Sequence, residues 1–174
     1  DLHKEYRRQR QMCIRDSKYM DPFLAAKYSH APDYPQTAKA AIAEMVRQQP
    51  RPVFAWEEKR GEDVPEEACE GAVMKRGVIV RQLLLPGCLK DARNIVRYLY
   101  ETYQNKIYVS LMSQYTPCAK AAEHPPLDRR ISKYEYEIAL DAMIDLGFDN
   151  GYVQSRRSAQ KDFIPDFQSH EGLL

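Results

Sequence analysis

Residues 77–87 read Gly-Val-Ile-Val-Arg-Gln-Leu-Leu-Leu-Pro-Gly. Apolar side chains fall on both faces of the two-residue repeat of a strand over Gly77–Leu85. A strand that is buried on both faces is typical of a parallel sheet covered by helices. Pro86 and Gly87 end this run. We therefore predict that Gly77–Leu85 is an inner strand of a parallel sheet.

Helices and strands alternate after this strand. The predicted elements are, in order, a helix over Asp91–Tyr103, a strand over Lys106–Met112, a helix from Ser132 to Leu146 and a short strand at Tyr152–Val153. Ser132 and Glu135 have the spacing of a capping box at the start of the second helix. Alternation of this kind predicts right-handed crossovers and a parallel sheet.

The number of strands limits the architecture. A complete (β/α)8 barrel takes about 250 residues, and three strands cannot close one. Two architectures therefore stay open, a small open sheet or the back of a larger barrel whose front is missing. No glycine-rich phosphate loop follows any strand, which counts against a nucleotide-binding open sheet. We expect an α/β fold, a partial (β/α) barrel truncated on its N-terminal side.

The sequence before this core has a different character. Gln11–Ser17 resembles the translation of a transposon adaptor used in sequencing libraries. We therefore expect residues 1–17 to be a non-native or disordered extension, the alternative being an ordinary N-terminal one. Residues 18–174 are expected to form the C-terminal part of the barrel. They begin with a helix after Asp21-Pro22 and another after Asp33. The charged excursion at about 54–73 predicts a solvated hairpin or loop.

Composition excludes several classes of function. The chain has 174 residues and a formal net charge of +1, which gives no broad attraction to nucleic acid or to an anionic membrane. No apolar run approaches the roughly 20 residues that span a bilayer. The four cysteines are widely and irregularly spaced and form no CxxC pair. A cytoplasmic protein without a locally encoded metal site is the expectation.

Three places at predicted strand ends carry polar side chains that could bind a ligand. Arg81 lies inside the apolar strand, so it needs an anion. A ligand carboxylate or phosphate, an internal Asp or Glu, and an edge position open to water all stay open. Ser113–Pro117, with Gln114 and Tyr115, follows the next strand and either contacts a ligand or caps the barrel. Lys18 precedes the first helix, where a surface charge is the plain alternative.

At this point the chain resembles a radical S-adenosylmethionine (SAM) family, the uncharacterised relatives of the pyruvate formate-lyase activating enzyme. The segments that carry the resemblance are Lys18–Asp21, Ala26–Ser29, Asp33–Pro35, Ala38–Ile42, Met74–Arg81, Leu85–Gly87, Ser110–Pro117, Glu135–Glu137, Gly151–Gln154 and Phe163–Phe167. Each motif is weak by itself, and their order and number carry the match from Lys18 to about Phe167.

The resemblance implies a partial barrel with a [4Fe–4S] cluster held by a CxxxCxxC motif. The cluster would cleave SAM reductively to a 5′-deoxyadenosyl radical, which abstracts a hydrogen atom. It also implies an electron donor and, in activating enzymes, a glycyl-radical-type enzyme as protein substrate. This sequence contains no CxxxCxxC. We therefore expect the cluster cysteines to lie outside this chain, and the chain by itself to be inactive.

The resemblance also assigns the candidate residues. Lys18 matches the lysine of the family's D-x-K segment, and Asp16 falls at the aspartate position, a match that we take as accidental because it lies in the suspected adaptor. Arg81 matches the family's strand arginine, with the carboxylate of SAM as its partner. Gln114 and Tyr115 fall where the family places groups near the cofactor. The alternatives are a barrel lyase or aldolase without a cluster, and a non-catalytic interaction module.

Overall fold

A computed structural model describes residues 12–54, 74–117, 121 and 123–153. The elements in chain order are β1 (Met12–Ser17), α2 (Pro22–Ser29), α3 (Tyr34–Gln48), β2 (Val53–Phe54), β3 (Met74–Leu83), α4 (Leu89–Tyr103), the 3₁₀ turn η3 (Gln104–Lys106), β4 (Tyr108–Met112), α5 (Lys133–Asp145) and β5 (Gly151–Val153). The predicted helices and strands are thus all present, with ends shifted by a few residues.

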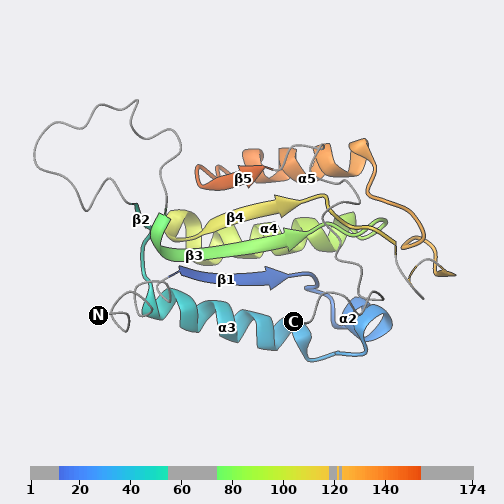
Figure 1. The fold of residues 1–174 in the computed structure, drawn as a ribbon, viewed down its shortest axis with the longest axis horizontal. Coiled ribbons are helices and arrows are strands. Elements are labelled where there is room, and N and C mark those ends of the chain that lie inside the picture. The colour runs from blue at the N-terminus through green and yellow to red at the C-terminus, as the bar shows by residue number, and fades with distance from the viewer. Residues whose placement is uncertain (1–11, 55–73, 118–120, 122, 154–174) are drawn as a thin grey trace, which may run out of the picture.

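The strands form one sheet in the order β1-β3-β4-β5, and each of these neighbours is parallel (Figure 1). The short strand β2 pairs antiparallel with the start of β3. The predicted α/β fold with a parallel sheet is therefore confirmed. Within the described residues the sheet is open, since its order begins at β1 and ends at β5.

The starts of α2 and α5 follow the capping signals of the sequence, whereas Asp33 makes no side-chain cap at the start of α3. The Asp21 side chain accepts a hydrogen bond from Phe23 N at 2.8 Å and caps α2. Ser132 and Glu135 form the predicted capping box at the start of α5. Both predictions of a helix start are confirmed, because local side-chain-to-backbone bonds need no distant partner.

The main core lies on one face of the sheet. Its members come from α3, α4 and α5 and from alternate residues of β3 and β4: Ile42, Val78, Val80, Leu84, Ala92, Ile95, Val96, Leu99, Tyr103, Ile107, Val109, Leu111, Tyr136, Ala139 and Met143. In Figure 1 the helices α4 and α5 lie behind the strands, and α3 runs beside β1. We call this side the helix-covered face.

The opposite side of the sheet is the open face, and it corrects one prediction. The strand around Arg81 was expected to be buried on both faces. Along β3, however, Val78 and Val80 are fully buried while Ile79 is only half-buried and Arg81 is exposed. Apolar composition alone cannot tell a covered face from an uncovered one, because it does not report on which side the crossover helices pack.

A second, smaller core lies at the end of the sheet where the strands end. Its buried members are Tyr19, Ala25, Leu85, Cys88 and Leu127. They join α2, the turn between β3 and α4, and the segment that follows β4. A Cβ at Gly87 would lie 2.5 Å from Cγ of Pro126, so this segment packs directly onto the β3–α4 turn.

The first described residues differ from expectation. Met12–Ser17 forms β1 and pairs in parallel register with β3, from Met12 opposite Gly77 to Ser17 opposite Gln82. From Met12 to Ser17, the structure therefore has an ordered strand where a disordered extension was one expectation. That these residues are non-native stays a prediction, because the formation of a strand does not depend on where its sequence comes from. Most of the charged excursion, residues 55–73, lies outside the described residues. No helix in the described part of the chain is long and apolar enough to span a membrane.

Candidate functional site

A row of side chains crosses the open face at one level of the sheet. The register places Asp16 of β1 beside Arg81 of β3, Arg81 beside Ser110 of β4, and Ser110 beside Tyr152 of β5. Residues opposite each other in parallel strands point to the same face. The row lies in the C-terminal half of β1 and β3 and crosses the middle of β4. Parallel sheets bind ligands at the C-terminal ends of their strands.

Arg81 and Asp16 form an ion pair in this row. Arg81 Nε donates to Asp16 Oδ1 at 2.6 Å, and the two side chains are 45% and 43% exposed. The alternative of an internal carboxylate is thus realised. Arg81 is open to water through the uncovered face and not at an edge, because β3 lies between β1 and β4. Exposed pairs of this kind contribute about 0–1 kcal/mol, so the pair is weak enough for a ligand to exchange with it.

The pairing also gives Asp16 a partner that the sequence analysis did not foresee. We took its position in the D-x-K pattern as accidental, yet the structure places it directly against Arg81. Whether the match to the D-x-K pattern is accidental stays a prediction.

Lys18 follows β1 and is exposed. Its backbone N–H donates to the Tyr34 hydroxyl at 3.1 Å, and that hydroxyl donates to the Asp16 carbonyl at 2.9 Å. Tyr34 of α3 therefore fixes the end of β1 and the backbone on both sides of Ser17. Burial raises the pKa of the Tyr34 hydroxyl, and the hydrogen bond from Lys18 partly offsets this rise.

Gln114 and Tyr115 follow β4 and are half-buried. The Tyr115 hydroxyl donates to the Leu127 carbonyl at 2.7 Å, and its ring packs against the smaller core. This contact gives Tyr115 a structural role in holding the segment after β4, the capping alternative of the sequence analysis. Of the candidate residues, the structure brings Arg81 into direct contact with Asp16, and it links the Lys18 backbone to Asp16 through the Tyr34 hydroxyl.

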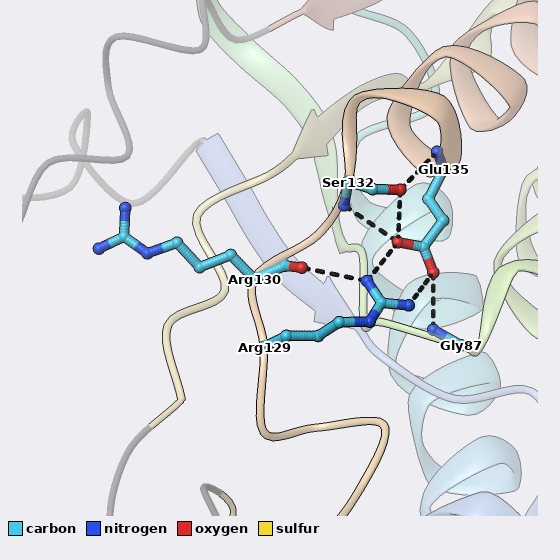
Figure 2. A network of polar contacts seen from close by, with 5 residues as sticks. All are labelled: Gly87, Arg129, Arg130, Ser132 and Glu135. Atoms are coloured by element: carbon cyan, nitrogen blue, oxygen red, sulfur yellow. Dashed lines mark hydrogen bonds and ion pairs between the residues drawn. The ribbon is translucent and has the colours of Figure 1, made fainter.

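Glu135 is the centre of a polar network that holds the same end of the sheet (Figure 2). Its carboxylate accepts from Gly87 N at 2.8 Å, from Ser132 N at 3.0 Å and from Ser132 Oγ at 2.8 Å. Arg129 adds two donors, Nη1 at 2.7 Å and Nη2 at 2.9 Å. The network ties α5 to the β3–α4 turn and to the segment before α5.

The charge of Glu135 is strongly stabilised. The bidentate hydrogen bonds from Arg129 are the largest cause, the backbone N–H groups of Gly87 and Ser132 add to them, and together they hold the pKa of the carboxyl far below its usual value despite burial. Sequence analysis found the capping box. It missed Arg129 and Gly87, because only the folded chain brings them to Glu135.

Asp91 holds the loop between β1 and α2. Its carboxylate accepts from Met20 N and from Asp21 N, both at 2.9 Å. Burial raises the pKa of Asp91, and these two bonds oppose the rise. Asp91, Met20 and Cys88 line an open cavity of about 370 Å³ beside α4. Burial is also the main cause of the raised pKa of the Cys88 thiol, which disfavours the reactive thiolate.

The described residues do not fit an iron–sulfur cluster. No group of three or more His, Cys, Asp or Glu side chains within them could hold a metal ion. Cys13 packs against the main core, whereas Cys88 is a member of the smaller one. Cys69 and Cys118 lie outside the described residues. The exchangeable Asp16–Arg81 pair on the open face is therefore the candidate site.

The chain was compared with protein families, curated proteins and solved structures. No protein-family model, no curated protein and no solved structure matches the chain.

Proposed function

We propose that this chain binds the methionine moiety of SAM on the open face, and that it belongs to a radical SAM enzyme. The observation that carries the proposal is the exposed Asp16–Arg81 pair at the C-terminal end of parallel strands. The resemblance in the sequence supplies the identity of the ligand. A barrel of radical SAM type is part of the same proposal.

The chemistry of the pair suits an amino acid. A guanidinium recognises a carboxylate through two parallel hydrogen bonds, and a carboxylate recognises an ammonium group. Arg81 uses Nε toward Asp16. Its two Nη groups make no hydrogen bond with the described residues, so they are available to a ligand carboxylate. Asp16 then meets the ammonium group of the same ligand, so that each charge of the zwitterion has an opposite charge beside it.

The proposal is limited to binding for this chain. Because the described residues offer no ligands for the cluster, the reductive cleavage of SAM is assigned to the parent enzyme, with cluster cysteines outside this sequence. An electron donor and a glycyl-radical-type protein substrate belong to that parent enzyme and follow from the resemblance alone. A cluster-free barrel enzyme and an interaction module are the competing outcomes of the test below.

Ligand binding to the purified chain tests the proposal. We expect SAM to shift the NMR signals of the Arg81 side chain and of the Ser110 backbone. Decarboxylated SAM should bind more weakly than SAM, because it lacks the group that Arg81 recognises. Replacing Arg81→Leu should remove this difference between the two ligands, as measured by NMR titration.

Arg93→Leu is the matched control, since Arg93 is an exposed arginine of α4. It should leave both affinities unchanged. Equal affinity for the two ligands in the unmodified chain would show that Arg81 does not recognise the carboxylate. Shifts confined to residues away from Asp16, Arg81 and Ser110 would assign the open face to another ligand.

A further inference from the structure

An aromatic pair lies beside the Asp16–Arg81 pair on the open face. Tyr152 of β5 occupies the end of the same row of side chains, with Ser110 between it and Arg81. The Tyr152 ring packs against the Tyr108 ring, with centroids 5.3 Å apart and planes inclined by 32°. Tyr152 is nevertheless 41% exposed. A partly exposed ring whose orientation is held by a second ring is suited to stack on a planar ligand.

We propose that Tyr152 stacks on the adenine ring of the ligand whose methionine moiety Asp16 and Arg81 bind. This inference rests on the proposed binding of SAM and adds a residue that recognises a second part of the same ligand. An aromatic side chain suits a nucleobase, because every base offers a flat π face. Ser110, between Arg81 and Tyr152, has a small side chain that the rest of the ligand can cross.

The spacing of the strands matches the length of the ligand. Neighbouring strands lie about 4.8 Å apart, so the backbone of Tyr152 lies about 10 Å from that of Arg81 and Ser110 lies halfway between them. An extended chain advances about 1.1 Å per bond, because the three backbone bonds of a residue span about 3.3 Å. In SAM about nine bonds, and hence about 10 Å, separate the carboxylate carbon from the adenine ring. With its carboxylate at Arg81, the ligand therefore reaches Tyr152 with its adenine.

The sulfonium is the other group of SAM that an aromatic ring attracts, through a cation–π interaction. It is about four bonds, or about 4.5 Å, from the carboxylate carbon, which places it over Ser110 and short of Tyr152. Two related ligands separate these groups. S-adenosylhomocysteine keeps the adenine and lacks the positive charge on sulfur, whereas S-methylmethionine keeps that charge and lacks the adenosine.

The affinities of these three ligands for a Tyr152→Leu variant test the proposal. We expect the variant to bind SAM and S-adenosylhomocysteine about tenfold more weakly than the unmodified chain does, because both lose the stacking of one base. Its affinity for S-methylmethionine should not change, since this ligand has no ring. Tyr152→Phe keeps the π face and should therefore bind SAM as the unmodified chain does. NMR titration measures each affinity.

Tyr134→Leu is the matched control, because Tyr134 is a 70% exposed tyrosine on α5. It should leave all three affinities unchanged. The unmodified chain adds a test that requires no variant to fold. Nuclear Overhauser effects should join the adenine protons of bound SAM to the ring protons of Tyr152, and their absence would overturn the proposal.

Three outcomes of the titrations contradict the inference alone. Equal affinity of SAM for the unmodified chain and for Tyr152→Leu would show that Tyr152 does not contact the ligand. An equal loss for all three ligands would show that Tyr152 only supports the fold. A loss for SAM and S-methylmethionine, but not for S-adenosylhomocysteine, would assign Tyr152 to the sulfonium. Absence of SAM binding to the unmodified chain is a different result, and it overturns the proposed function together with this inference.

Discussion

The two faces of the sheet differ in how deeply their side chains are buried. On the helix-covered face, Val80 and Leu111 are fully buried under the crossover helices. On the open face, the next residues along the same strands, Arg81 and Met112, are exposed or half-buried. The strands are apolar on both sides, so composition does not create this difference. The connections create it, because they place α3, α4 and α5 on one side only.

The difference teaches where to look for function. The apolar side chains of the helix-covered face pack against α3, α4 and α5, although the Gln82 amide oxygen is buried there without a hydrogen-bond partner. The open face holds an exposed ion pair, Asp16–Arg81, and an aromatic pair, Tyr108 and Tyr152, with ring centroids 5.3 Å apart. Charged side chains and partly exposed rings are uncommon in a packed core. Side by side on a surface, they are typical of a binding site.

Substitutions at two neighbouring residues of β4 test whether the two faces differ in packing. Leu111→Ala should cost about 3–4 kcal/mol of unfolding free energy, because Leu111 is fully buried and its removal leaves a cavity. Met112→Ala should cost about 1 kcal/mol, because Met112 is half-buried on the open face. Urea unfolding of both variants gives the two values. Equal costs would show that the open face is packed as tightly as the other.

The end of the sheet that both faces share depends on Glu135. Glu135→Gln should cost about 2 kcal/mol, because hydrogen bonds to a buried charge are lost. Since the folded pKa is depressed, this contribution is present above the usual pKa of 4.5 and is lost as the pH falls below it. The unmodified chain should therefore lose stability below that pH more steeply than the variant does.

Chemical unfolding between neutral and acid pH measures this difference in slope. Glu137→Gln is the matched control, because Glu137 lies on the same helix, is exposed, and meets Lys133 at 3.4 Å. It should cost far less than Glu135→Gln. Parallel stability curves for the unmodified chain and Glu135→Gln would mean that Glu135 does not hold its charge in the fold.

The smallest expected effect belongs to the open face itself. A double-mutant cycle with Asp16→Asn and Arg81→Gln should give a coupling of about 0.5 kcal/mol, as for other exposed pairs. Added salt should reduce this coupling further, because exposed charges are screened. Unfolding of the four chains at low and high salt measures it. A large, salt-insensitive coupling would place the pair in a buried environment and remove the contrast between the two faces.

Local signals in the sequence predicted the elements well. The capping box at Ser132, the helix start at Asp21 and the apolar run of β3 each depend on near neighbours, so their outcomes could be foreseen. Of the candidate residues, Arg81 was placed correctly on a strand and an anionic partner was foreseen, although the burial from which that partner was inferred is absent. The partner was missed, because Asp16 lies 65 positions away and only the β1–β3 register brings it close.

The sequence by itself determined the order of helices and strands, and hence a parallel sheet. Spacing and capping are properties of neighbouring residues, and a chain carries them before it folds. Only the tertiary structure decided which face of β3 is covered, that Arg81 meets Asp16, and that Glu135 gathers Arg129 and Gly87. Those outcomes depend on which distant segments pack together. The residue pattern permits several such packings, and the side of the crossovers and the strand register select one.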